Sequence, residues 1–185
     1  METEYNKYVP HLINFWKHEI KDQVYKLKPV INKNANPFLF ILKEAENGNL
    51  LDWLNTKDSF LAYIILMFYV SKMVYVKRKY YKNDLKVTLF MEMGIENYKS
   101  IMNQDEILTV YSPYLYSENY YNVEQAKNII LNLLNTRNNK IKICLFRIEK
   151  ILNILKKYNR LPERNKYLNR ESTEDEIDYL DTLDN

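Results

Sequence analysis

The chain of 185 residues contains only two glycines and five prolines. Turn-rich β-architectures use these residues at positive-φ positions and tight reversals, so their scarcity argues against a sandwich or barrel and favours an all-α fold. Because the glycines stand alone at Gly48 and Gly94, neither a phosphate-binding loop nor a dinucleotide-binding glycine motif is present. We therefore predict a helical protein outside the nucleotide-binding classes.

Cysteine and histidine are equally scarce. The single cysteine, Cys144, excludes an internal disulfide, and it lies in an apolar series of helical spacing, which predicts a core residue in a reducing compartment. His11 and His18 are seven residues apart and would share a helix face, but no carboxylate or thiolate pairs with them to complete a metal site. We predict no metal, no cofactor and no cysteine nucleophile.

Long hydrophobic runs are also missing. The longest, Phe60–Val70, has eleven residues, whereas a bilayer-spanning helix needs about twenty. This run predicts a buried central helix. Residues 1–20 mix charged and apolar side chains without a cleavage-site pattern, so we expect no secretory signal, no membrane span and a cytoplasmic location.

Charge is unevenly distributed. The net charge is only +3, but residues 171–185 contain seven acidic residues and neither lysine nor arginine, which leaves +10 on the preceding 170 residues. A basic body of this kind attracts an acidic partner unless the tail folds back and neutralises it.

Apolar residues recur at helical spacing along the rest of the chain. This pattern, together with prolines, glycines and capping residues, predicts about seven or eight antiparallel helices in one domain over residues 1–185. The first four predicted helices run from Pro10 to Pro29, from Pro37 to Gly48, from Asp58 or Ser59 to about Val76, and from Asn83 or Asp84 to Gly94. A short helix within 105–121, broken at Pro113, follows them. The last two predicted helices cover about 122–135 and 140–158.

The segment 159–176 is the most specific motif. Pro162 ends the preceding helix, and Thr173 with Glu176 forms a capping box that opens a short acidic helix within 171–185. Between them lie polar groups able to bond a carboxylate or orphaned carbonyls: Arg160, Arg164, Asn165, Arg170 and Glu171. We expect Arg160 and Arg164 to tie this loop to helix ends and to Glu118, with direct ligand binding as the alternative.

Two aromatic segments offer further binding surfaces. The first interleaves cations with tyrosines, as in proteins that bind single-stranded nucleic acid, and comprises Lys77, Arg78, Lys79, Tyr80, Tyr81 and Lys82. Its alternative interpretation is a solvated helix end. The second, Tyr111–Tyr121, either fills the core or lines a peptide groove.

Four sequence elements together resemble the bacterial domain-of-unknown-function family 924. They are Leu12–Trp16, the set Ala45, Gly48, Leu51 and Trp53, the set Tyr111, Pro113, Ser117 and Glu118, and the C-terminal set Arg160, Pro162, Arg164, Asn165, Leu168, Arg170, Glu171, Ser172 and Thr173. The resemblance covers nearly the whole chain. It implies an all-α, TPR-like superhelical array.

The departures from that family concern titratable side chains. Leu115 and Tyr116 stand where the family has glutamate and histidine, Phe68–Met73 lacks an acid, a proline and an arginine, and two further histidines fall at about Ile151 and at Glu163. These losses favour a non-catalytic adaptor with a protein partner. An enzyme or small-molecule binder with a reduced site at Tyr116, Ser117, Glu118, Arg160 and Arg164, extended by Asn165 and Arg170, is the second hypothesis, and nucleic-acid binding through Lys77–Lys82 is the third.

Overall fold

A computed structural model describes residues 4–21, 33–75, 77–133 and 139–184 of the chain, and throughout these residues the regular structure is helical. The protein is all-α, as the sequence predicts. Short 3-10 and π-helical segments join or extend the α-helices. The α-helices are α1 (Tyr8–Phe15), α2 (Leu39–Glu46), α3 (Lys57–Ile64), α4 (Ser71–Val74), α5 (Lys77–Tyr98), α6 (Gln104–Leu115), α7 (Tyr120–Leu133), α8 (Asn139–Tyr158), α9 (Asn165–Leu168) and α10 (Glu174–Asp184).

The apolar run at Phe60–Val70 forms the centre of the molecule. It belongs to one helical path from α3 through the π-helical segment Ile65–Val70 into α4, with helical backbone angles at both junctions. Helices α1, α2, α5 and α6 pack around it, so Phe60 and Tyr63 are fully buried. Each such large side chain contributes roughly 1.5–3 kcal/mol by leaving water. The predicted buried central helix is confirmed.

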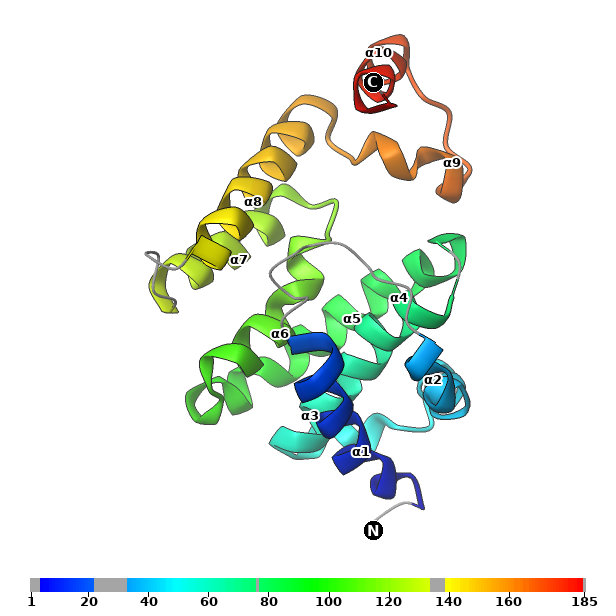
Figure 1. The fold of residues 1–185 in the computed structure, drawn as a ribbon, viewed down its shortest axis with the longest axis vertical. Coiled ribbons are helices and arrows are strands. Elements are labelled where there is room, and N and C mark those ends of the chain that lie inside the picture. Colours follow the sequence, from blue (N-terminus) through cyan, green and yellow to red (C-terminus); the bar gives the residue numbers. More distant parts are fainter. Residues whose placement is uncertain (1–3, 22–32, 76, 134–138, 185) are drawn as a thin grey trace.

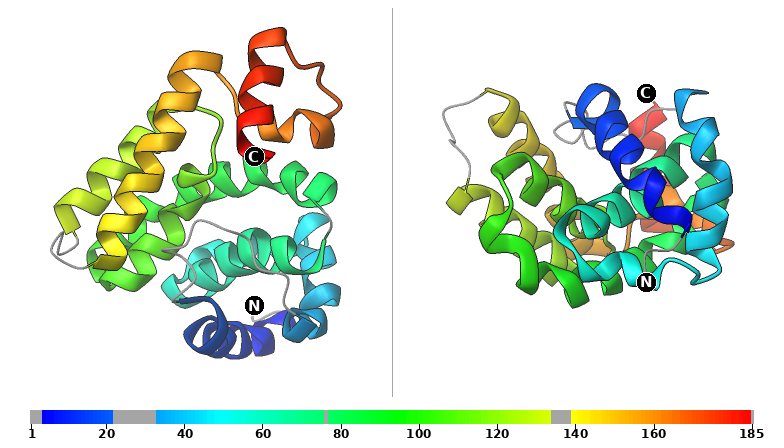
Figure 2. Two further views of the ribbon diagram at one scale, coloured as in Figure 1. Left: turned by 45° about the horizontal axis from the view of Figure 1, so that its top comes forward. Right: turned by 90° about the horizontal axis from the view of Figure 1, so that it is seen from below.

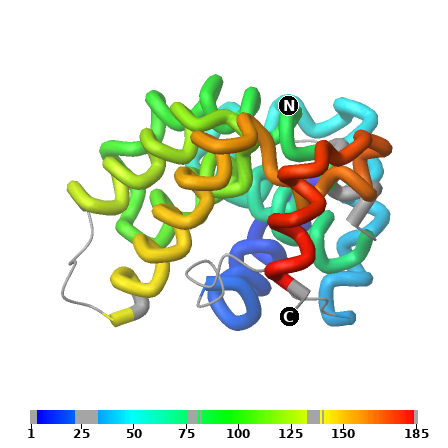
Figure 3. The backbone as a smooth tube through the Cα atoms, turned by 90° about the horizontal axis from the view of Figure 1, so that it is seen from above, coloured from blue at the N-terminus to red at the C-terminus, as the bar shows by residue number. Residues whose placement is uncertain are grey.

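Helices that follow one another in the chain pack against one another from α5 to α8. Figure 1 places α1 and α2 in the lower part of the molecule, α5 and α6 in the middle, α7 and α8 at the upper left, and α9 and α10 at the upper right and top. The tube in Figure 3 shows α7 and α8 running side by side. Figure 2 shows the C-terminal segment, orange to red, beyond the end of α8 and on the opposite side of the molecule from the N-terminal helix.

The first helix is tied to the body through a buried indole. Trp16 Nε1 donates a 2.9 Å hydrogen bond to Thr109 Oγ1 in α6. Helix α1 begins at Tyr8, two residues before the predicted start at Pro10. The predicted continuation of this helix to Pro29 falls mostly on residues 22–32, which lie outside the described residues.

Two predicted helix starts are wrong. Thr56, rather than Asp58 or Ser59, caps α3: its backbone is extended and its side chain accepts the Ser59 N–H. Helix α5 begins at Lys77, so Asn83 and Asp84 lie inside it rather than at its start. Capping propensity does not decide this start, because the Asn83 side chain donates to Glu46 and does not cap its own backbone.

Two predicted helix ends are also wrong. Helix α5 continues past Gly94 to Tyr98, and Gly94 serves packing instead: a Cβ atom there would lie 2.3 Å from Cε2 of Phe60. Helix α6 continues through Pro113 to Leu115, although proline removes one backbone hydrogen bond. Both residues are buried where the helices pack tightly, so tertiary contacts override the local signals.

Other local predictions are confirmed. Gly48 has the left-handed φ of 87° expected just after a helix. Thr173 and Glu176 form the predicted capping box at α10, with Glu176 N–H to Thr173 Oγ1 at 3.3 Å and Thr173 N–H to Glu176 Oε2 at 2.9 Å.

Candidate functional site

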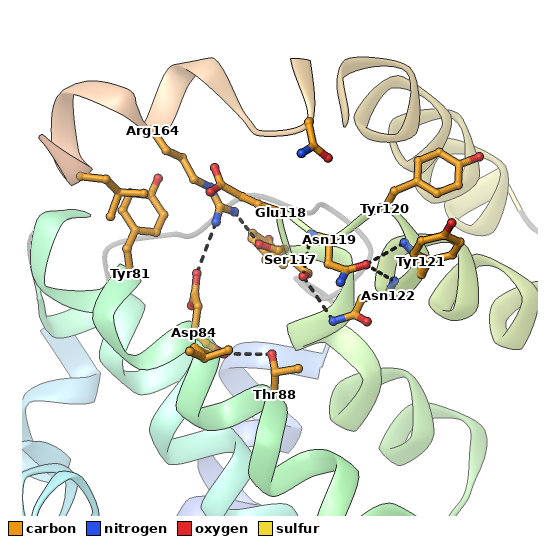
Figure 4. Close-up of a pocket in the computed structure, with 14 residues that line it drawn as sticks. Tyr81, Asp84, Thr88, Ser117, Glu118, Asn119, Tyr120, Tyr121, Asn122 and Arg164 are labelled. Atoms are coloured by element: carbon orange, nitrogen blue, oxygen red, sulfur yellow. Dashed lines mark hydrogen bonds and ion pairs between the residues drawn. The ribbon is translucent and has the colours of Figure 1, made fainter. Parts of the chain in front are cut away.

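A cavity of about 580 Å³ lies where three parts of the chain meet. One wall comes from α5, a second from the connection between α6 and α7 with the first turn of α7, and the third from the segment after α8 (Figure 4). Its lining residues are Tyr81, Asp84, Leu85, Thr88, Tyr116, Ser117, Glu118, Asn119, Tyr120, Tyr121, Asn122, Asn159, Arg164 and Leu168. The volume is within the range of about 300–1,000 Å³ typical of ligand sites.

Arg164 enters this pocket from the C-terminal side (Figure 4). Its Nη2 donates a 2.7 Å hydrogen bond to the carbonyl oxygen of Tyr116, and its guanidinium lies over the Tyr81 ring at 4.7 Å from the centroid. Nη1 is 3.6 Å from Asp84 Oδ2, which is an ion-pair distance beyond hydrogen-bond length. The guanidinium plane is therefore held by an aromatic face and a backbone carbonyl.

A buried lysine completes the charged cluster behind the pocket. Lys72 in α4 pairs with Asp84 Oδ1, and its ammonium lies 4.1 Å from the centroid of the Phe68 ring. Burial lowers the pKa of Lys72; Asp84 opposes this change and the Arg164 cation adds to it. Asp84 thus joins two cations from separate parts of the chain.

Glu118 anchors the C-terminal segment to the α6–α7 connection. Arg170 donates to both of its carboxylate oxygens, at 2.7 and 2.9 Å, and the backbone N–H of Leu161 donates to Oε1 at 3.1 Å. Burial opposes ionisation of Glu118, but these hydrogen bonds outweigh it and hold the pKa of the carboxyl below its ordinary value. This bidentate pair fastens one wall of the pocket to another.

A second bidentate pair docks α10. Arg160 donates to the two carboxylate oxygens of Glu176 at 2.6 Å each, and Asn165 Nδ2 donates to Oε2 at 3.2 Å. The hydrogen bond from Arg160 is the largest cause that lowers the pKa of Glu176 to about 2, although burial opposes it. We refer to the interactions of Arg160, Arg164, Asn165 and Arg170 as the C-terminal clamp.

The predicted site residues therefore divide into two groups. Tyr116, Ser117, Glu118 and Arg164 meet at the pocket, whereas Arg160, Asn165 and Arg170 belong to the clamp outside its lining. The expected loop-to-body ties exist, but with different partners: Glu118 is bound by Arg170 rather than by Arg160 or Arg164. Whether the pocket group binds a ligand stays a prediction.

Sequence analysis missed several lining residues. Asp84 was interpreted as a helix cap, and its role as a bridge between Lys72 and Arg164 has no local signal because the three belong to different elements. Asn159 has a left-handed φ of 56°, which carries the chain from the end of α8 into the clamp. Asparagine tolerates this conformation, so its place after a long helix was the available signal.

The tyrosine segment 111–121 is divided between the core and the pocket, and a peptide-binding role for it stays a prediction. Tyr111 and Tyr114 are buried in the core, whereas Tyr116, Tyr120 and Tyr121 line the pocket. Tyr121 is 77% exposed at the rim. Aromatic side chains at such a position are common in recognition surfaces.

The proposed nucleic-acid segment Lys77–Lys82 forms the first turns of α5. Apart from Tyr81, which lines the pocket, the side chains of this segment lie outside the described residues. Nucleic-acid binding stays a prediction.

The remaining predicted candidates have ordinary surroundings. Cys144 is fully buried, and burial raises the pKa of its thiol to about 11. His11 and His18 are both exposed, and the described part of the chain holds no cluster of three potential metal ligands. In the same residues, no helix is both long and apolar enough to cross a bilayer.

Comparisons with known proteins agree with this architecture. The structure is similar to that of a protein of unknown function from Agrobacterium tumefaciens, with a TM-score of 0.78 and 21% sequence identity, over 96% of this chain and 98% of that one. At this identity the likeness shows the shared fold alone. No curated protein matches the chain. The family described as "Bacterial protein of unknown function (DUF924)" matches residues 12–184, so the chain belongs to the DUF924 family.

Proposed function

We propose that this protein is a non-catalytic binding module that takes a segment of a protein partner into the pocket and along α5. The observation that carries the proposal is a row of exposed apolar side chains that continues the pocket. Leu85, Leu89 and Met93 follow one another at four-residue spacing in α5 and are 81%, 54% and 59% exposed. We refer to these three residues as the α5 stripe. Leu85 also lines the pocket, and contiguous exposed apolar surface of this kind is typical of protein-interaction sites.

The state of the acidic groups supports binding rather than acid–base catalysis. Glu118 is held ionised by Arg170 and by the Leu161 backbone, so it is a poor proton donor near neutral pH. Asp84 is engaged by Lys72 and Arg164. These carboxylates stabilise the walls of the pocket.

Small-molecule binding is the second candidate function. It is favoured by the convergence of Tyr116, Ser117, Glu118 and Arg164 on one cavity of about 580 Å³. A purely small-molecule site gives no role to the α5 stripe, which is why we place it second. In both cases we propose a cytoplasmic protein whose single domain has the TPR-like superhelical arrangement implied by the sequence.

Photocrosslinking in the native host tests the proposal. A benzophenone amino acid replaces Tyr121 at the pocket rim, and a matched control replaces Phe146, which is 61% exposed on α8 and lies outside the pocket lining. We expect a discrete adduct with one polypeptide from position 121 and none from position 146. Native mass spectrometry of the protein purified from the host then distinguishes the two candidates. If a metabolite is bound and position 121 gives no polypeptide adduct, small-molecule binding replaces partner binding as the proposed function.

A further inference from the structure

Among the residues that the structure describes, the charged cluster behind the pocket joins three cations, Lys72, Arg164 and Arg170, to two carboxylates, Asp84 and Glu118. Lys72 and Arg164 both pair with Asp84, and Glu118 is bound by Arg170 and is also attracted by the Arg164 charge. The side chains of Lys72 and Arg164 are 4% and 9% exposed, so water screens the excess cation poorly. A negative group entering the pocket would balance it.

Arg164 is the member of this cluster placed to receive such a group. It lines the pocket, and Figure 4 shows its guanidinium projecting between Tyr81 and Glu118 toward Asp84. The Tyr81 ring and the Tyr116 carbonyl fix the plane of the guanidinium. A planar donor that is already oriented loses little side-chain entropy when it binds a carboxylate.

The α5 stripe defines what lies next to that group. Its spacing of four residues matches one helical turn, the same period at which an amphipathic helix presents its own apolar residues. Leu85 belongs both to the stripe and to the pocket lining. An anionic side chain at Arg164 and apolar side chains on the stripe could therefore come from one continuous segment.

We infer that the partner segment is an acidic amphipathic helix, with an aspartate or glutamate carboxylate that pairs with Arg164 and an apolar face that covers Leu85, Leu89 and Met93. This inference rests on the proposed function and adds the chemistry of the ligand. A basic side chain in the same place would face the excess positive charge of Lys72 and Arg164.

Three synthetic helical probes test the inference by fluorescence anisotropy. The first carries one glutamate followed by leucines at four-residue spacing, and its twins replace the glutamate by glutamine or by lysine. We expect the glutamate probe to bind about tenfold more tightly than the glutamine twin, because it alone makes a charge-assisted bond to Arg164. The lysine twin is expected to bind most weakly. The preference for glutamate should shrink as salt is raised.

Protein variants then separate the two parts of the contact. Leu89→Ser with Met93→Ser changes exposed positions only, and it should weaken the glutamate and glutamine probes by the same factor. Arg164→Gln should abolish the difference between the probes. Arg160→Gln is the matched control, since it weakens the clamp at Glu176 but leaves the pocket lining intact, and it should retain the glutamate preference. Thermal melting of each variant reports its folding independently.

Equal affinity of the glutamate and glutamine probes for the unaltered protein would overturn the inference, whether or not Arg164→Gln folds. Unchanged binding by the Leu89 and Met93 variant would also overturn it, as would displacement of the glutamate probe by a short single-stranded oligonucleotide at equal or lower concentration. If position 121 still crosslinks to a polypeptide while the probes show no preference, the proposed function survives and only the partner's chemistry is wrong.

Discussion

Replacing Gly94 by alanine sets two well-known effects against each other. In an exposed helix interior this change stabilises by roughly 1 kcal/mol, because alanine loses less backbone entropy. In this protein the added methyl would lie 2.3, 2.7 and 2.9 Å from three ring atoms of Phe60. Phe60 is fully buried, and its ring packs at 5.4 Å from that of Tyr98, so the ring has little room to withdraw.

The magnitude follows from the size of the overlap. Overpacking a core by a methylene group typically costs about 1–3 kcal/mol, and three contacts below 3.0 Å place Gly94→Ala at the upper end of that range. After the propensity gain is subtracted, we expect a net loss of about 1–2 kcal/mol in the free energy of unfolding. For a protein of this size, that loss lowers Tm by about 2–8 °C.

Urea denaturation monitored by circular dichroism measures this loss. A double-mutant cycle with Phe60→Leu tests whether the overlap with the Phe60 ring causes the loss. The smaller leucine side chain makes room for the added methyl group, so Gly94→Ala should become neutral or stabilising in that background. Gly48→Ala is a useful comparison. Nothing lies within 4 Å of its Cβ position, so its cost arises only from the φ of 87°. A Gly94→Ala protein at least as stable as the parent would refute the packing argument.

Three further results are expected. Arg164→Ala should lower the free energy of unfolding by about 2–4 kcal/mol in urea titrations, since it removes the buried hydrogen bond to the Tyr116 carbonyl and the guanidinium packed on the Tyr81 ring; a parental melting curve would mean that the clamp does not stabilise the fold. Glu176 and Glu118 have lowered pKa values in the folded protein, so the stability they contribute is complete above their unfolded pKa of about 4.5 and is lost as pH falls below it; for Glu176 the loss extends to a pH of about 2, and Glu176→Gln should reduce it in acid titrations. Cys144, buried with its pKa raised to about 11, should react with a thiol reagent at the rate of unfolding; rapid modification of the native protein would contradict its core position.

Local sequence signals predicted those parts of the fold that depend on local physics. The capping box at Thr173 and Glu176 and the left-handed Gly48 each involve a few consecutive residues, and both were found from the sequence. The buried helix at Phe60–Val70 was also predicted, because a run that is apolar on all sides has to be enclosed. Composition alone gave the all-α class.

The incorrect predictions concern residues whose structural role is set by contacts with residues far away in the sequence. Gly94 looks like a helix end, but Phe60, more than thirty positions earlier, accounts for the glycine. Asp84 looks like a cap, yet it joins Lys72 to Arg164, which lie more than ninety positions apart in the sequence. For the same reason the sequence identified only part of the candidate site, the compact Tyr116–Glu118 stretch with Arg164, and did not assign the α5 wall to it.

The C-terminal clamp also affects the order in which the molecule is assembled. Two walls of the pocket, from α5 and from the start of α7, are synthesised well before the third, which arrives with Asn159, Arg164 and Leu168. During translation the helices up to α8 would stand with that side open until Arg170 reaches Glu118. A nascent chain would therefore form its helical core first, and the pocket would gain its third wall only once residues 159–170 have left the ribosome.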